Sequence, residues 1–171
     1  MKIIEALKRL GVIEKRIAHN NAEITKYASK LNTEMPVFES VAEQKKQVAQ
    51  RVQANADLAE EYLRLKKAID FTNLMTTVEL NGKLYSIADL LFIKRKVASM
   101  HMDTYKALND SAARLRERTV GSVDNKRPVV ELMYSEEQKN TKLREWMDLY
   151  DIIDARLEVI NATTELMEMK Q

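Results

Sequence analysis

The chain has 171 residues, enough for one domain with a sizeable core, and its composition is 45% hydrophobic and 32% charged. Only three glycines and two prolines interrupt many helix-forming residues, which favours long helices over a strand-rich fold. There is no cysteine, so disulfides and thiolate metal sites are excluded, and a net charge of +2 does not by itself indicate nucleic-acid binding.

The charges are unevenly distributed along the chain. Residues 1–32 carry seven Lys/Arg and three Asp/Glu, a net of +4, whereas residues 135–171 carry five and nine, a net of −4. We expect the first and last helices to attract one another, within or between chains. The alternative is a basic N-terminal face that meets phosphate, but this face lacks interleaved aromatic side chains. Protein partners are therefore expected, and nucleic acid is not.

A seven-residue repeat of apolar side chains predicts a first helix over residues 3–31. The second series of this repeat, three residues after the first, is Ala6, Ile13, Asn20 and Tyr27. Together the two series form the a/d pattern of a coiled coil, which buries itself along another helix. We expect the polar break at Asn20 to fix helix register or oligomeric state; the alternative is a polar site shared by His19, Asn20, Asn21 and Glu23. The predicted interaction seam is Ile3, Leu10, Ile17, Asn20, Ile24 and Leu31.

A second helix is predicted from about Phe38 or Ser40 to Phe71, with a weaker repeat that Asn55 interrupts. A β-hairpin is then expected at about 76–86, because Asn-Gly at its centre supplies the two positive-φ residues of a type I′ turn. Since an isolated hairpin is marginally stable, we expect residues 128–134 to add a third strand.

The third helix is predicted from Ile87 to Arg118, after an N-cap at Ser86. A polar, mobile loop is expected at 119–127, and the capping box at 135–138 opens a fourth helix that extends to about Met167. The sequence thus predicts a mainly α fold, a single elongated domain over 1–171. Its four long antiparallel helices would form a bundle or coiled-coil hairpins.

Polar residues that would support chemistry are sparse. His19 and His101 lie on separate helices, and His19 with Glu23 supplies too few ligands for a metal site. The carboxylates from Asp148 to Glu158 have no histidine partner at metal-binding spacing, so a solvated face is expected. The phosphate-loop, dinucleotide, zinc-protease and nucleophile-elbow motifs are absent. We therefore expect no enzyme, no catalytic residue, no cofactor and no metal.

Charged residues recur every few positions from the start of the chain. The sequence has no uninterrupted apolar stretch of the kind that a signal peptide or a transmembrane helix requires. We therefore expect a protein that is cytoplasmic when synthesised.

Three segments share a pattern with a known family: Ile3–Leu7, then Ile69–Thr77 with the Asn-Gly turn and the helix opening 86–91, and finally Ile160–Leu166. They resemble the septicolysin-like family of small bacterial proteins, with its I-N-x-T-N-x-x-T segment and terminal N-x-T-T-E-L. Asp70 departs from the family's Asn, and the acidic, proline-containing loop of the family is reduced here to 32–40. The resemblance implies a helical fold, and the family name implies cytolytic activity. It also implies a structural role, hydrogen bonding to the hairpin backbone, for Thr72, Asn73, Asn161, Thr163 and Thr164.

The function that we expect is a non-catalytic structural or assembly role. The protein would oligomerise or bind protein partners through its heptad seams, and a phage virion component is one natural setting. The alternative, from the resemblance, is a membrane-active protein that acts through an amphipathic helix, the third or the fourth. A small enzyme that uses Asp/Glu and Lys is disfavoured, because no convergent set of catalytic roles is found.

Overall fold

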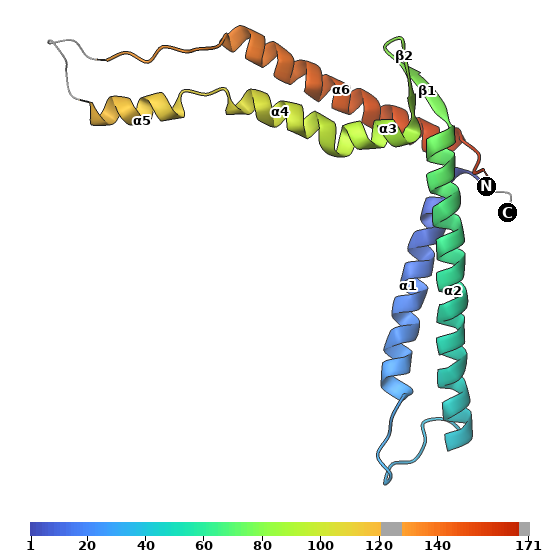
Figure 1. Cartoon of the computed structure of the whole chain (residues 1–171). Helices are drawn as coiled ribbons and strands as arrows, with labels where there is room; N and C mark the ends of the chain where they lie inside the picture. Colours follow the sequence, from blue (N-terminus) through green and yellow to red (C-terminus); the bar gives the residue numbers. More distant parts are fainter. Residues whose placement is uncertain (121–127, 168–171) are drawn as a thin grey trace. The chain divides into compact units, whose positions relative to one another are not determined.

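The computed structural model describes residues 1–120 and 128–167. It is mainly helical with a small two-stranded antiparallel sheet, which confirms the predicted fold class (Figure 1). The helices are α1 (Ile3–Tyr27), α2 (Val41–Met75), α3 (Ile87–Phe92), α4 (Ala98–Ala107), α5 (Ser111–Thr119) and α6 (Glu136–Thr163). A π-helical segment, η1 (Ile93–Val97), joins α3 to α4, and the strands are β1 (Thr77–Leu80) and β2 (Lys83–Ser86).

The chain divides into two compact units. Unit 1 comprises Met1–Thr77 and the chain from Val159 onward, and unit 2 comprises Val78–Glu158. Helix α6 therefore contributes most of its length to unit 2 and its last turn to unit 1. This division concerns packing and not the cooperativity of folding, so the single domain over 1–171 stays a prediction.

Unit 1 is built on an antiparallel hairpin of α1 and α2 (Figure 1). Its core contains the buried residues Ala6, Leu10, Ile13, Leu65 and Ile69. Four half-buried side chains pack against this core: Ile17, Leu58, Tyr62 and Leu166. The a/d repeat of α1 produces this arrangement, because side chains at i, i+3 and i+7 share one helix face.

Helix α1 ends at Tyr27, four residues before the predicted end. Leu31 consequently lies outside the helix, is 64% exposed and is no part of the packed seam. The cause is a local turn in which the backbone N–H of Leu31 donates to Glu34 Oε2 at 2.9 Å. Lys30 Nζ donates to the backbone oxygens of Leu31 and Glu34, so this turn competes with a continued helix.

The two ends of the described chain pair in unit 1. Lys2 and Glu165 form an isolated antiparallel β-bridge. The N–H of Ile3 donates to the Thr164 oxygen at 3.0 Å, and the N–H of Leu166 donates to the Met1 oxygen at 2.7 Å. Helix α6 therefore stops at Thr163, earlier than predicted, because the following residues pair with the N-terminal segment in this bridge.

Unit 2 contains the predicted hairpin, β1–β2. Asn81 and Gly82 both have positive φ, 51° and 75°, as a type I′ turn requires. The third strand predicted at 128–134 is not formed, and within the described residues the sheet has only β1 and β2. Pro128 cannot donate to a ladder, and Val129 and Met133 are 83% exposed, so this segment buries no apolar face.

The predicted third helix is interrupted. Ala98 N–H donates to the Ile93 oxygen, an i to i−5 bond that makes η1 a π-helical turn. The chain then leaves the helical conformation after Ala107, where Asn109 Nδ2 donates to the Ala107 oxygen at 3.0 Å. Asn109 Oδ1 accepts from the Ser111 N–H at 3.0 Å, so one side chain ends α4 and starts α5.

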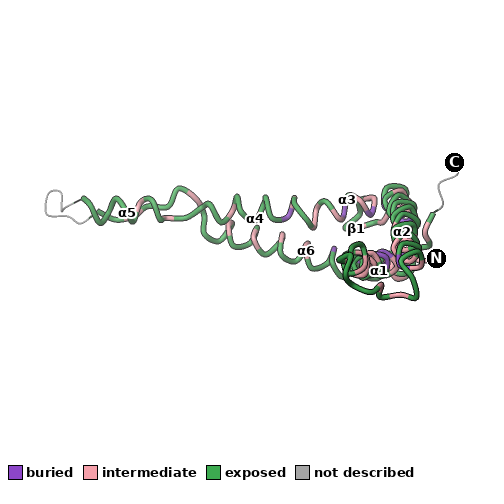
Figure 2. The backbone as a smooth tube through the Cα atoms, turned by 90° about the horizontal axis from the view of Figure 1, so that it is seen from below, coloured by how far each residue is buried: buried purple, intermediate pink, exposed green. Residues whose placement is uncertain are grey.

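Burial in unit 2 is confined to one part of the helix pair. Its buried hydrophobic residues are Ile87, Leu90, Ala98, Ile153 and Leu157. Helix α5 has no buried residue, and in Figure 2 its trace is exposed or intermediate throughout. Apart from Thr119 and Val120, the loop predicted at 119–127 lies outside the described residues.

Candidate helical interface

The two polar breaks of the heptad repeats meet between α1 and α2. Asn20 Nδ2 donates to Asn55 Oδ1 at 2.9 Å, and Asn55 Nδ2 donates to Asn21 Oδ1 at 2.9 Å. Two amides satisfy each other at only one offset of the helices, whereas apolar side chains tolerate several offsets. The Asn20–Asn55 pair therefore specifies the antiparallel register of the hairpin.

Ion pairs on one side of the seam support the same register. The Arg9 guanidinium donates to both Glu61 carboxylate oxygens, at 2.7 and 2.8 Å. This hydrogen bond lowers the pKa of Glu61 and raises the pKa of Arg9. Glu23 Oε2 lies 3.5 Å from Arg51 Nη2, so the carboxylate considered as a metal partner of His19 is ion-paired instead. Partly exposed pairs of this kind contribute little stability, but they discriminate between registers.

Within the single chain, the first half of the predicted interaction seam is already buried or half-buried. Ile3 and Leu10 are buried, and Ile17, Asn20 and Ile24 are half-buried. Packing is looser towards the loop, where a hollow of about 380 Å³ lies between the end of α1 and the start of α2. Leu31 lies beyond it in the linker.

Gln44 closes the loop end of the hairpin, and sequence reasoning missed it. Its side chain is buried, its Nε2 donates to the Tyr27 oxygen at 2.8 Å, and its Oε1 accepts from the Val37 N–H at 3.1 Å. Gln44 thereby satisfies a carbonyl at the end of α1 and holds the linker. Its position in the repeat, three residues after Val41, is the signal that would have identified it.

The residues predicted to brace the β-hairpin lie in unit 1, around the paired chain ends. The Thr72 hydroxyl donates to the Ala68 oxygen at 2.7 Å and accepts from the Met167 N–H at 2.8 Å, so it holds the C-terminal segment rather than the hairpin.

The other predicted bracing residues lie near the ends of α2 and α6. The Thr163 hydroxyl donates to the backbone oxygen of Val159 in its own helix, and the Thr164 backbone oxygen accepts from the Ile3 N–H. Two further members of the set, Asn73 and Asn161, are buried and half-buried respectively. Within the described residues, Asn73 Oδ1 has no hydrogen-bond partner.

In unit 2, large amphipathic side chains occupy the contact of η1 and α4 with α6. His101 stacks on Trp146 with ring centroids 4.0 Å apart and planes 9° apart. Lys94 forms an ion pair with Asp154, which raises the pKa of Lys94, and its Nζ lies 5.7 Å from the Tyr150 ring centroid. Such side chains pack their apolar parts while their polar ends stay in water, which explains the low burial of this contact.

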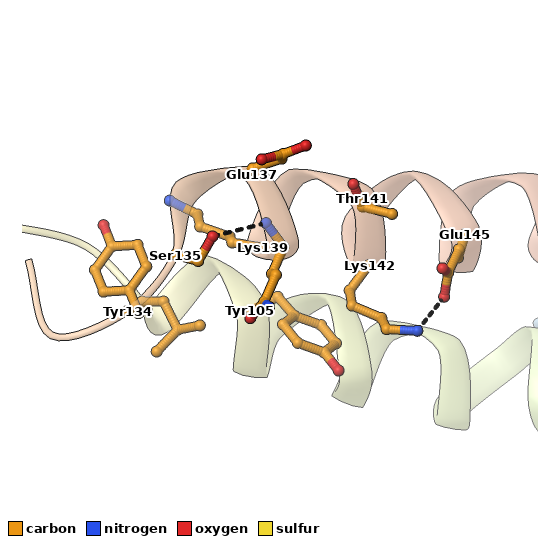
Figure 3. A pocket seen from close by; sticks show the side chains of 10 residues that line it. Tyr105, Tyr134, Ser135, Glu137, Lys139, Thr141, Lys142 and Glu145 are labelled. Carbon is orange, nitrogen blue, oxygen red and sulfur yellow. Dashed lines mark hydrogen bonds and ion pairs between the residues drawn. The ribbon is translucent and has the colours of Figure 1, made fainter.

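An open groove of about 730 Å³ lies between the outer part of α4 and the first turns of α6 (Figure 3). Lys142 donates to Glu145 at 2.6 Å, and Lys139 Nζ lies 5.4 Å from the Tyr134 ring centroid. The Ser135 hydroxyl accepts from the Gln138 N–H at 3.2 Å and so caps α6. These polar groups stabilise the helix start, and the serine has no base positioned to activate it among these contacts.

Residues 1–120 and 128–167 contain neither the side-chain cluster of a metal site nor a helix that could span a membrane. In this part of the chain, no three His, Asp or Glu side chains converge as a metal site would require. Over the same residues, every helix is too short or too polar to cross a membrane.

Comparisons with known proteins add a fold relationship. Neither a protein-family model nor a curated protein matches the chain. The chain is similar to a solved structure, the crystal structure of a functionally unknown conserved protein from Corynebacterium diphtheriae, with a TM-score of 0.61 and 17% sequence identity. The match covers 98% of this chain and 99% of that chain. At this identity, the similarity shows a shared fold alone.

Proposed function

We propose that the protein is a non-catalytic structural or assembly protein that associates with protein partners through its helical surfaces. One observation carries this proposal: in both units, large apolar side chains are exposed on regular helices. Examples are Leu63 on α2, Phe92 on α3, Met100 on α4 and Ile152 on α6. Exposed apolar side chains on rigid helices are typical of surfaces that another protein covers.

The polar contacts support a structural role as well. The Asn20–Asn55 pair fixes a register, Gln44 closes a helix end, and Ser135 caps a helix. Each of these side chains forms a hydrogen bond with the backbone or with another side chain. Catalytic groups need a nucleophile, a base and an orienting partner that converge on a reacting atom, which is a different arrangement.

The setting that we propose is a multi-subunit particle, of which a phage virion is one example. A small helical subunit without cysteine suits such a particle, because its contacts come from helix faces and not from covalent links. Sedimentation velocity over a series of micromolar concentrations tests the assembly role. We expect a species larger than the 19.8 kDa of the single chain. A single-chain mass at every concentration would contradict the proposal.

A membrane-active role, as the septicolysin-like resemblance implies, is the second candidate. One observation favours it: α5 combines Arg114, Arg116 and Arg118 with an exposed Leu115. A basic helix with an apolar residue is one feature of interfacial membrane binding. Release of a fluorescent dye from anionic lipid vesicles tests this candidate. Arg116→Glu would reduce the release if α5 acts at the membrane, and intact vesicles with the unaltered chain would eliminate the candidate.

A further inference from the structure

The α1–α2 hairpin carries a second apolar surface beside its seam, here called the apolar face. On α1 it comprises Ile4, Leu7, Gly11 and Ala18, and on α2 it comprises Ala49, Val52, Ala56, Ala59 and Leu63. The spacing on α2 is three and four residues in alternation, so these side chains form one continuous row. The row on α1 follows the same spacing, with Glu14 at its centre.

Both rows lie on the same broad side of the hairpin. On α1 they lie one and four residues after the seam residues Ile3, Leu10 and Ile17. On α2 they lie one and four residues after Val48, Asn55 and Tyr62, which recur every seven residues. In an antiparallel helix pair these positions face the same way. The opposite side is identified by its contacts. It holds the Arg9–Glu61 pair and an open groove whose lining includes Arg16, His19 and Asp57. The charged side chains of the hairpin therefore gather on this opposite side, where they lie beside Val12 and Leu58.

The apolar face is exposed, and its polar side chains are held by bonds within the chain. Leu7 is 44% exposed, and Val52 and Leu63 are each 54% exposed. Glu14 accepts from the Tyr62 hydroxyl at 3.0 Å, and Asn21 accepts from Asn55. At one end, Lys66 pairs with Asp70 at 2.8 Å. The face is thus mainly apolar: Glu14 within the α1 row is held by Tyr62, and Asn21, Lys66 and Asp70 lie at the ends of the rows.

Gly11 is the most informative residue of this face. It lies inside α1, where glycine costs about 1 kcal/mol relative to alanine. A Cβ added to Gly11 would meet nothing within 4 Å, and Gly11 is not among the positive-φ glycines. Neither packing within the chain nor backbone conformation therefore requires glycine there. A helix that approaches from outside the chain would require it, because only glycine lets two backbones come close.

We propose that a second copy of this chain docks on the apolar face and forms a two-fold symmetric, four-helix interface. This inference rests on the proposed assembly function and names its partner. Each row runs about 21 Å along its helix and is one helix wide, so covering both rows removes about 500 Å² of surface on each copy. Two copies would bury about 1,000 Å², the lower end of the range of specific interfaces, so a concentration-dependent dimer is expected.

The face is also complementary to itself, as a two-fold interface must be. Leu7, Val52 and Leu63 project as large side chains. Gly11 and the alanines of the same face carry no side chain or only a methyl group. Two copies related by a two-fold axis bring the large side chains of each to the small residues of the other. Burying these leucines and the valine on both copies then supplies the driving force.

Light scattering on the full chain, with matched Arg substitutions on the two sides of the hairpin, tests the proposal. Ala56→Arg places a charge in the apolar face, and Val12→Arg places the same charge on the opposite side, where Val12 is also exposed. We expect a dimer for the unaltered chain and for Val12→Arg. For Ala56→Arg we expect the dimer dissociation constant to rise about 100-fold or more with helical content unchanged, because a buried charge without a partner is costly. A dimer that survives Ala56→Arg and is lost with Val12→Arg would overturn this face and leave the assembly function standing.

Gly11→Ala provides a test in which two quantities change in opposite directions. The substitution removes the helix penalty of glycine, so the melting temperature of the single chain, measured at high dilution, should rise. The same methyl group fills the space that the second copy needs, so the dimer dissociation constant should also rise. A higher melting temperature with an unchanged dissociation constant would remove the argument from Gly11. A single-chain mass for the unaltered protein at all concentrations would overturn both the docking and the assembly function.

Discussion

The two units achieve helix pairing by different means. In unit 1, two helices bury a continuous row of aliphatic side chains, from Ala6 to Ile13 on α1 against Leu65 and Ile69 on α2. In unit 2, a single helix, α6, faces a helix interrupted by a π turn and by the break at Asn109. Beyond Ala98 on that side, the contact with α6 consists of half-buried or exposed side chains such as His101 and Tyr105.

This difference shows that a seven-residue repeat specifies pairing but not burial. Alanine, leucine and isoleucine at the repeat positions of its core let α1 and α2 pack closely. Lysine, histidine, tryptophan and tyrosine at the matching positions of unit 2 keep their polar ends in water and hold the helices with stacking and ion pairs. We therefore expect unit 1 to be the more stable part of the molecule.

Native-state hydrogen exchange should reveal the largest difference between the units. We expect amides of α1 from Leu10 to Ile13 to exchange at least about 100-fold more slowly than amides of α5, because exchange from a helix without buried residues requires only local opening. Mass spectrometry of peptides from the two helices measures the ratio. Equal protection in α1 and α5 would refute the contrast.

Truncating a side chain at the helix contact should lower the free energy of unfolding strongly in unit 1 and weakly in the outer part of unit 2. Ile69→Ala removes a buried side chain and should lower the free energy of unfolding by about 2–4 kcal/mol. Leu143→Ala, at a half-buried position of α6, should lower it by less than about 1.5 kcal/mol. Urea denaturation followed by circular dichroism gives both values. A larger loss for Leu143→Ala than for Ile69→Ala would reverse the assignment.

The effects of substituting Asn20 and Asn55 on stability should be energetically coupled. Asn55→Leu leaves the Asn20 amide without its partner and should cost about 1 kcal/mol. The double variant with Asn20→Leu and Asn55→Leu should recover that loss, because two apolar side chains then face each other. A double-mutant cycle by urea denaturation measures the coupling energy. Additive effects of the two substitutions would show that the amide pair does not act as a unit.

The pH dependence of stability should be the smallest effect. The hydrogen bond from Arg9 lowers the pKa of Glu61, and the bonds from Ser86 lower the pKa of Asp89. A carboxylate with a lowered pKa in the folded state stabilises the protein above its unfolded pKa, about 4 to 4.5. That contribution disappears as the pH falls through the lower, folded-state value.

Unfolding free energies measured between neutral pH and acid should therefore decrease below about pH 4.5. Glu61→Gln should flatten part of this decrease, since it removes the titrating group but keeps the side-chain shape. Glu60→Gln is a matched control on the adjacent residue of α2. An equal flattening by both substitutions would rule out a specific role of the Arg9 pair.

Much of the fold was accessible from the sequence, because its signals are local. The repeat of Ile3, Leu10 and Ile17 identified α1, and Asn-Gly at 81–82 identified the hairpin. The register was partly accessible: Asn20 and Asn55 were recognised as polar breaks, but their contact depends on the length of the linker between the helices.

The remaining features depend on tertiary context. Asn109 ends α4 because its amide bonds to the local backbone, although leucines at seven-residue spacing, Leu108 and Leu115, favour a continued helix. Thr72 was singled out as a brace, but its partner, the Met167 N–H, is 95 residues away in the sequence. The apolar face was missed because α1 and α2 carry its two rows separately, and only the antiparallel pairing brings them to one side.

The distance between spin labels in two associated chains tests the central claim most directly. The chain has no cysteine, so Ala59→Cys places a single label on the apolar face and Asp57→Cys places one on the opposite side of α2. Pulsed electron resonance should give a defined distance for the label at Ala59 that is shorter than the distance at Asp57 by about 10–20 Å, since each helix layer is about 10 Å thick. A shorter distance at Asp57, or no dipolar coupling at Ala59, would contradict docking on this face.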